Sequence, residues 1–329
     1  MTGFFRATFL YMLAATVLTS ILLDDPLGTL VGLTRIVSSF LGLIAGASAA
    51  FVPVMLLLLW WFGRKVPLER LRPMLIVALA SVWLQVGFML FKSAIPQLVP
   101  FFADPFWAWA DQVLLFGHDA WQLAHMITPE ALIPWFPLVY LTTWSLTAYA
   151  FPVLVTAIER DEAVALRYLW LFFLSWVLCG NVFALAGSSV GPVYYDRQLG
   201  GDRFAAMAAS FEQSGYAQSA IALLQDRLWS RSGEAMSFIS AFPSVHVAVA
   251  VIVALYLRER LPRLRFAGYG FLALIGLISV YSGYHYLLDG IASLVIVLGI
   301  HAALIRGFAR RAGGILPAVT TPTISPHLP

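Results

Sequence analysis

The sequence is poor in charged residues and has almost no cysteine. Only 11% of its 329 residues are charged and 60% are hydrophobic, whereas a soluble domain is about half apolar and about a quarter charged. Cys179 is the only cysteine, which excludes an internal disulfide and a metal site built from several cysteines. The net charge of the chain, +3, is small, and the basic residues lie beside apolar runs. Both observations argue against a nucleic-acid partner. This composition indicates an integral membrane protein.

Long apolar runs predict an all-α fold, a polytopic membrane bundle of about eight transmembrane helices. About 20 helical residues cross roughly 30 Å of hydrocarbon. The N-terminal run is longer than a signal-peptide core and has no clear cleavage site, so we expect an uncleaved first span. Residues 104–127 mix tryptophans with polar groups and are predicted to form interfacial helices. The predicted spans are 4–23, 41–62, 74–91, 131–156, 165–187, 241–258, 265–283 and 286–307.

Basic residues predict the orientation of the chain. Arginines cluster in the links after spans two, four and six and again after span eight. With eight alternating spans these links share one side, and the positive-inside rule makes that side cytoplasmic. We therefore expect both termini inside a bacterial inner (plasma) membrane, with the loops 92–130 and 188–240 on the outer face.

Two short motifs meet at this outer face. The first, 240-SAFPSVHVAVA-250, precedes the sixth span. Pro243 is expected to begin the helix, where its missing N–H does no harm. Ser244 and the free backbone amides of the first turn then form a helix N-terminus suited to an anion. His246 lies in the same turn.

The second motif, 281-YSGYHYLLDG-290, forms the turn between the last two spans. A spacing of four places His285 and Asp289 on one helix face. A carboxylate there can hold one ring nitrogen and raise the basicity of the other, as in a nucleophilic histidine. A structural histidine or a helix-stabilising contact explains either motif singly. The predicted topology brings both histidines to one membrane level, which favours a functional site.

FPSVH followed by YSGYHYLLD resembles the type 2 phosphatidic acid phosphatase superfamily, whose second signature is PSxH and whose third ends in HxxxD. The HYxxD form, with Tyr281 four residues before His285, looks most like the branch that contains fungal inositol phosphorylceramide synthase. The resemblance is specific over 240–290 and looser over 110–240. The first three spans have no clear counterpart in the six-helix core of the family.

The resemblance implies a mechanism without metal or cofactor. His285 would attack phosphorus and form a phosphohistidine, oriented by Asp289, while His246 would act as general acid and then as base. Ser244 and the backbone amide of Val245 would hold phosphate oxygens. It also implies N-terminal membrane helices over 1–103 and a catalytic membrane domain over 104–313. The end of the chain is rich in Pro and Thr, which predicts a disordered tail over 314–329.

The first family signature, KxxxxxxRP, occurs literally from Lys65 to Arg72 and Pro73. Predicted topology places this loop on the cytoplasmic side, about 30 Å from the histidines, so we interpret it as a coincidence. The equivalent is expected in 186-AGSSVGPVYYDRQLGGDRF-204, where Arg197 and Arg203 can bind an anion. Arg197 is preferred because it is nearer the end of the span.

Ser279 stands six residues before His285, where the family usually has arginine. Arg197, Arg203, Arg227 or Arg231 must then supply the cation, or phosphate binding is weaker. Three tyrosines near these motifs are candidates for the substrate pocket: Tyr194, Tyr195 and Tyr281.

A phosphohistidine can pass its phosphoryl group to water or to a lipid hydroxyl. The HYxxD form, the missing arginine and the long outer loop favour transfer of a phospho-headgroup from a phospholipid or lipid phosphate to a lipid alcohol acceptor. Hydrolysis of phosphatidic acid or a polyprenyl phosphate stays open. So does a proton-coupled transporter with the His/Asp cluster as relay, although transport sites usually lie at the bilayer midplane.

Overall fold

The computed structural model describes residues 1–38, 68–230 and 239–313, and these residues form helices and connecting turns. The α-helices are α1 (Thr2–Leu22), α3 (Leu71–Leu98), α4 (Asp104–Leu114), α5 (Ala120–Ile127), α6 (Trp144–Ile158), α7 (Glu162–Val177), α8 (Phe183–Ala186), α9 (Pro192–Leu199), α10 (Ala205–Gln213), α11 (Ala220–Ser230), α12 (Val245–Arg260), α13 (Arg265–Tyr281) and α14 (Leu287–Gly313). Short helical turns are η1 (Leu68–Arg70), η2 (Glu130–Trp135), η3 (Leu138–Thr143), η4 (Leu178–Val182), η5 (Tyr216–Gln218) and η6 (Pro262–Leu264).

Six helical segments in the described part of the chain are long and apolar enough to cross a membrane. They are Thr2–Leu22, Leu68–Leu98, Glu130–Ile158, Glu162–Ala186, Pro262–Tyr281 and Leu287–Phe308. The predicted all-α membrane fold is confirmed, but about eight spans are not shown. The predicted span 41–62 lies outside the described residues. The predicted span 241–258 is α12, which begins later and has only 16 residues.

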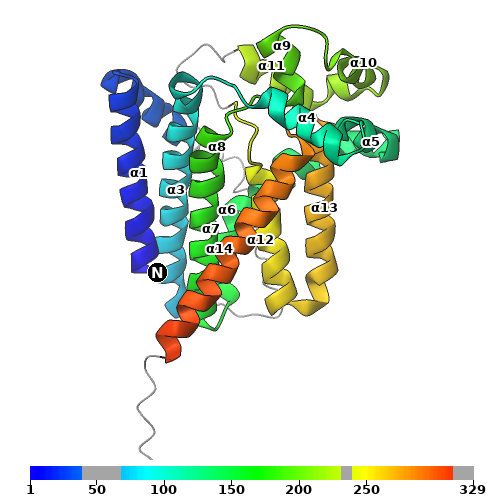
Figure 1. Cartoon of the computed structure of the whole chain (residues 1–329). Coiled ribbons are helices and arrows are strands. Elements are labelled where there is room, and N and C mark those ends of the chain that lie inside the picture. Colours follow the sequence, from blue (N-terminus) through cyan, green and yellow to red (C-terminus); the bar gives the residue numbers. More distant parts are fainter. Residues whose placement is uncertain (39–67, 231–238, 314–329) are drawn as a thin grey trace, which may run out of the picture.

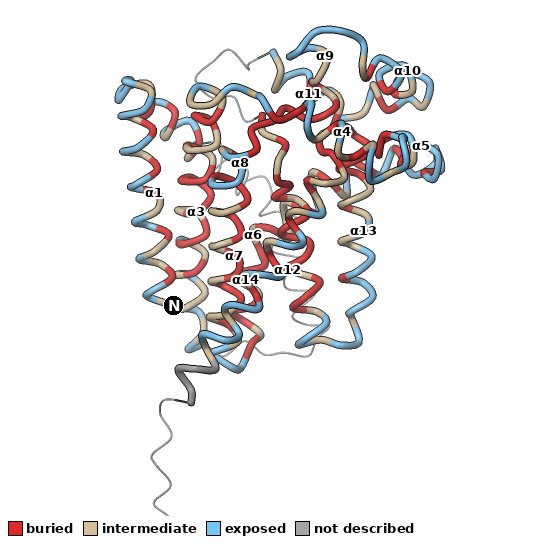
Figure 2. The backbone as a smooth tube through the Cα atoms, viewed as in Figure 1, coloured by how far each residue is buried: buried red, intermediate tan, exposed pale blue. Residues whose placement is uncertain are grey.

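Helix α12 is the central helix of the bundle. Buried residues occur on all of its sides, and it contacts α6, α7, α13 and α14. A helix that is apolar all round packs inside other helices rather than on one face of them. Figure 2 shows the buried backbone of α12 enclosed by helices with exposed outer faces. The first turn of α12, which carries His246, is therefore fixed from several directions.

The remaining helices are arranged around this centre (Figure 1). Helix α1 packs along α3 at one side of the bundle, and α3 also contacts α6. The short helices α4, α5 and α9–α11 gather at one end, so residues 104–127 form two short helices there, as the tryptophan pattern predicts. The chain starts at the opposite end, where α14 also finishes.

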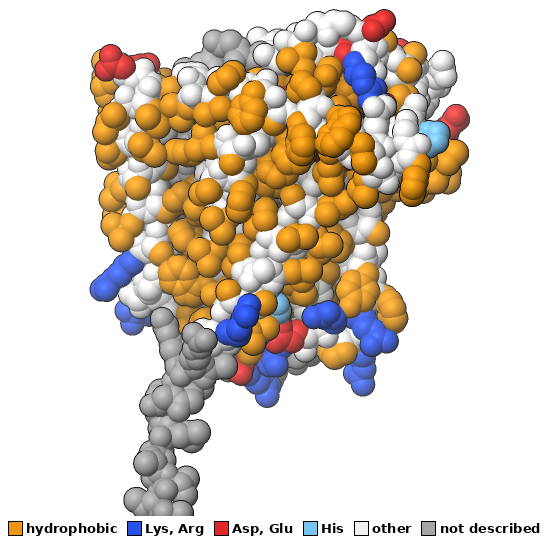
Figure 3. All heavy atoms as spheres, in the orientation of Figure 1, with side chains coloured by type: hydrophobic (Ala, Val, Ile, Leu, Met, Phe, Trp, Pro, Cys, Tyr) orange, Lys and Arg blue, Asp and Glu red, His pale blue; other side chains and the backbone are white. Residues whose placement is uncertain are grey.

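The two ends of the bundle differ in charge. In the face shown in Figure 3, most lysine and arginine side chains lie at the end away from α9–α11, and a broad hydrophobic band separates the two ends. The guanidinium groups of this basic end are partly paired: Arg167 contacts Glu259, and Arg260 holds Glu159 through two hydrogen bonds of 2.7 and 2.8 Å. The histidine motifs lie toward the other end, close to α4.

Candidate active site

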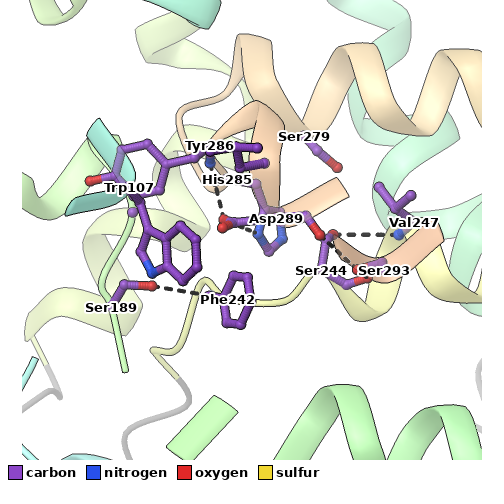
Figure 4. A network of polar contacts seen from close by, with 12 residues as sticks. Trp107, Ser189, Phe242, Ser244, Val247, Ser279, His285, Tyr286, Asp289 and Ser293 are labelled. Carbon is purple, nitrogen blue, oxygen red and sulfur yellow. Dashed lines mark hydrogen bonds and ion pairs between the residues drawn. The ribbon is translucent and has the colours of Figure 1, made fainter. Parts of the chain in front are cut away.

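The turn between α13 and α14 brings His285 against Asp289. The ring nitrogen Nδ1 of His285 lies 3.2 Å from Oδ2 of Asp289, and the same oxygen accepts the backbone N–H of Tyr286 at 3.0 Å (Figure 4). A carboxylate oxygen only accepts, so Nδ1 carries the hydrogen and Nε2 carries the lone pair. Asp289 is completely buried, so solvent does not compete for its contact with His285. This contact therefore fixes the orientation of the His285 ring.

His246 lies in the first turn of α12, with its ring centroid 6.3 Å from that of His285. Two aromatic rings of η3 and α6 enclose it: Tyr140 is stacked at 4.4 Å and Trp144 lies at 4.0 Å. The Trp144 indole N–H also donates to the His246 carbonyl at 3.0 Å. The rings are close enough for one phosphate group to contact both histidines, as the predicted shared site requires.

Ser244 links the two motifs through its backbone. Its amide donates to the Asp289 carbonyl at 3.3 Å, and its own carbonyl accepts the Ser293 hydroxyl at 2.8 Å. The Ser244 hydroxyl caps α12 by accepting the Val247 amide at 3.4 Å. The helix thus begins at Val245 and not at Pro243, because the side chain of Ser244 supplies the N-cap. The predicted phosphate contact of Ser244 stays a prediction, and Val245 lines the adjoining cavity.

A cavity of about 270 Å³ reaches both histidines. Its walls are mainly apolar and aromatic, with side chains from α3, η3, α6 and α11 and from the segment before α12. The lining includes Tyr194, one of the three predicted pocket tyrosines, and Tyr284. Apolar walls beside a few polar groups are typical of sites for small amphipathic ligands.

The other two predicted pocket tyrosines lie elsewhere. Tyr195 packs against Phe204. The Tyr281 ring is tilted against His125, with ring centroids 4.0 Å apart, and its hydroxyl donates to the Ser214 hydroxyl. Neither lines the cavity described above. Their role in a substrate pocket therefore stays a prediction that this geometry does not support.

Helix α4 stabilises the site through two buried carboxylates, Asp104 and Asp111, which lie on the same helix face. Asp111 accepts the amides of Leu287 and Leu288 at 2.7 and 3.0 Å and so caps α14. Asp104 accepts the amides of Val190 and Gly191 at 2.8 and 2.9 Å. A carboxylate at a helix N-terminus satisfies otherwise unpaired amides and interacts favourably with the helix dipole. These contacts fix the helix turn that carries Asp289.

Gly191 is where the outer loop passes closest to the histidine turn. Its φ is +86°, and a Cβ there would lie 2.4 Å from the Tyr284 carbonyl oxygen. Only glycine adopts this conformation readily and permits this approach. The next residues continue the contact, because the Val193 amide donates to the Gly283 carbonyl at 2.9 Å. The chain thus turns at Gly191 and Pro192, and this turn packs against the segment that carries His285.

The two arginines predicted to bind phosphate are both paired with carboxylates. Arg197 lies 2.9 Å from Asp226 at the surface, and Arg203 makes a two-pronged contact with Asp119 at 2.7 and 2.5 Å. The Asp119 carboxylate raises the pKa of Arg203 further. Neither arginine lines the cavity that reaches the histidines. Their phosphate role stays a prediction, and this geometry does not favour it.

Burial determines the protonation of the site. Desolvation, followed by the positive charge of Lys92, lowers the pKa of His285 to about 3, so its ring is neutral near pH 7. Desolvation also raises the pKa of Asp111 to about 6, although the two α14 amides oppose this shift. A neutral imidazole with Nδ1 held by a carboxylate is the form that attacks an electrophile.

Comparison with known proteins agrees with this geometry. The profile of the PAP2 superfamily matches residues 106–303, which include both histidine motifs and most of α4. The chain belongs to the PAP2 superfamily. This membership confirms the predicted superfamily and makes the protein a membrane enzyme of the phosphatase or phosphotransferase type that acts on phosphate esters. The match does not distinguish the inositol phosphorylceramide synthase branch from others. No curated protein and no solved structure matches the chain.

Three charged groups near the two histidines were not predicted from the sequence. Lys92 lines the cavity, while Asp104 and Asp111 hold its framework. A predicted span ending at residue 91 left Lys92 in a loop, although α3 continues to Leu98. A signal was present, because ionisable residues in or beside a membrane span are functional candidates. Among the described residues no cluster of three His, Cys, Asp or Glu side chains is arranged for a metal.

Proposed function

We propose that the protein is a lipid phosphotransferase or lipid phosphate phosphatase that acts through a phosphohistidine on His285. The observation that carries the proposal is the buried His285–Asp289 pair, with the His246 ring 6.3 Å away at the edge of an apolar cavity. The pair supplies a neutral nucleophile of fixed tautomer, and the second ring supplies a proton donor. Membership of the PAP2 superfamily supports the same assignment.

The reaction proceeds in two displacements. Nε2 of His285 attacks phosphorus while the ester P–O bond breaks, and His246, which takes up a proton as the anionic substrate binds beside it, gives that proton to the departing oxygen. The positive charge that forms on the His285 ring is stabilised by the Asp289 carboxylate, 3.2 Å from Nδ1. His246 then takes a proton from the acceptor hydroxyl, whose oxygen attacks phosphorus and breaks the P–N bond. Free His285 is restored.

The acceptor distinguishes transfer from hydrolysis. We favour transfer to a lipid alcohol, because the cavity beside the histidines has mainly apolar walls and little polar surface for free water. The resemblance of HYxxD to the inositol phosphorylceramide synthase branch favours the same reaction. Hydrolysis of a lipid phosphate requires only that water take the place of the alcohol.

We place the site on the outer face of the bacterial inner membrane, with both termini in the cytoplasm. The support is the concentration of arginines at the end of the bundle where α1 begins and α14 finishes. The histidine motifs lie toward the opposite end, beside the short helices α4 and α9–α11.

Purified protein in lipid nanodiscs tests the proposal. Phosphatidic acid, a polyprenyl phosphate and phosphoinositide donors labelled in the headgroup are supplied with and without ceramide or diacylglycerol. A new labelled phospholipid identifies transfer, and labelled free phosphate identifies hydrolysis. His285→Ala and His246→Ala should each abolish turnover in protein with an unchanged thermal transition. Full turnover by folded His285→Ala contradicts the proposed mechanism.

A further inference from the structure

One cation lines the cavity beside the histidines, and it comes from the N-terminal part of the chain. Lys92 lies near the end of α3, outside residues 106–303 that match the PAP2 superfamily. It lines the same cavity as His246 and His285 and is half-buried. In the described lining it is the only lysine or arginine.

The ammonium group of Lys92 can donate more hydrogen bonds than the one it forms within the described residues. Its Nζ donates to the Ser240 carbonyl at 3.3 Å and lies 5.6 Å from the centre of the Phe88 ring. A lysine ammonium has three hydrogens, so one carbonyl bond leaves two donors. Within the part of the chain that the structure describes, Lys92 forms no ion pair with a carboxylate. An unneutralised charge among apolar walls is costly unless an anion joins it.

Among the described residues, neither the other candidate cations, Arg227 included, nor the residue at the usual arginine position lines this cavity. Arg197 and Arg203 are paired with Asp226 and Asp119 and lie outside the cavity lining. Ser279, which stands where the family usually has arginine, is also outside it, and its hydroxyl donates to Tyr140 at 3.2 Å. The described residues that line the cavity therefore offer two histidines and one cation, Lys92, to an incoming phosphate group.

Given the proposed function, we propose that Lys92 binds the substrate phosphate and replaces the arginine that is absent at position 279. Helix α3 thereby contributes a binding residue to the active site from outside the superfamily domain. The Ser240 carbonyl holds the ammonium beside the segment that leads into the PSxH motif. The two remaining N–H groups bind phosphate oxygens while His285 attacks phosphorus. The lowered pKa of His285, to which Lys92 contributes, agrees with this proximity.

Kinetics with inhibitors tests this role. Removing a charge-assisted hydrogen bond weakens phosphate binding, so Lys92→Met should raise the Ki of orthovanadate by about 10- to 100-fold. The KM of the lipid phosphate donor should rise in parallel, and Lys92→Arg should restore most of both. Arg263→Gln, which removes one exposed charge at the other end of the bundle, is the matched control and should change neither constant. An unchanged vanadate Ki in folded Lys92→Met overturns the assignment.

Lysine labelling gives a second readout that does not depend on turnover. The chain has only two lysines, Lys65 and Lys92, and reductive methylation of each is followed by mass spectrometry. Vanadate should slow methylation of Lys92 and leave Lys65 unaffected, also in catalytically inactive His246→Ala. Equal methylation of Lys92 with and without vanadate contradicts phosphate contact.

The two experiments separate this inference from the proposed function. If His285→Ala is inactive and Lys92→Met keeps a normal vanadate Ki, only the role of Lys92 is wrong. If folded His285→Ala retains turnover, the phosphohistidine mechanism is wrong, whatever Lys92 does.

Discussion

Replacing Asp289 by asparagine removes the negative charge of the buried pair and little else. The amide oxygen of asparagine can occupy the place of Oδ2 and accept from both His285 Nδ1 and the Tyr286 amide. The amide nitrogen then takes the place of Oδ1, which has no partner among the described residues. The ring keeps its tautomer and orientation, so the variant reports on charge.

The expected loss follows from the distance between the two groups. As His285 attacks, a positive charge develops on its ring with Nδ1 3.2 Å from the Asp289 carboxylate. At an effective dielectric constant of about 20, two unit charges so close attract by about 5 kcal/mol. Loss of this attraction in the transition state lowers kcat by about 10³- to 10⁴-fold.

Turnover in nanodiscs measures this effect, with thermal unfolding in the same preparation as a check on folding. The matched control is Asp202→Asn, which makes the same chemical change at an exposed position and should keep kcat within about twofold of wild type. If folded Asp289→Asn keeps more than a tenth of the wild-type kcat, charge stabilisation by Asp289 is not the reason for its place beside His285.

Two further perturbations test the framework. Burial lowers the pKa of His285 to about 3 in the folded protein. As the pH falls, this histidine is therefore protonated in the unfolded chain before it is protonated in the folded one. Stability from this residue is present above pH 6.5 and is lost as pH falls toward 3. Acidification from pH 7 to 5 should therefore lower the free energy of unfolding by about 2 kcal/mol more in wild type than in His285→Gln. Unfolding in mixed micelles measures both values, and equal decreases in the two proteins refute this expectation. Gly191→Ala places a Cβ 2.4 Å from the Tyr284 carbonyl oxygen at a φ of +86°, so it should lower the thermal transition temperature and abolish turnover. Gly200→Ala is the control, because its φ is also positive (+78°) but no atom lies near the added Cβ. The difference between the two variants separates the cost of the steric clash from the cost of the positive φ.

The membrane helices and the histidine motifs are predictable from the sequence because both depend on short-range patterns. Apolar runs identify the six spans that the structure describes. The spacing of four residues brings His285 to Asp289, although His285 lies just before α14 and not within it. The sixth crossing, predicted over 241–258, illustrates the limit: α12 is apolar enough to be buried but starts later, because Ser244 provides its N-cap.

Pairing of charges was the part that sequence position did not predict. Arg203 lies close to the predicted turn, yet its guanidinium is held by Asp119, 84 residues earlier. Asp111 caps α14 from 176 residues away. No local pattern specifies such pairs, since they depend on which helices pack side by side.

By itself, the sequence determined a helical membrane protein with two histidine motifs and a superfamily chemistry. Hydrophobic periodicity, helix caps and residues four apart act within one or two turns, so they can be read along the chain. Only the tertiary structure decided what surrounds the histidines: the apolar cavity, the carboxylates of α4, and Lys92 from a helix outside the superfamily domain. These neighbours come from the packing of distant segments around α12, which brings their charges within reach of the site.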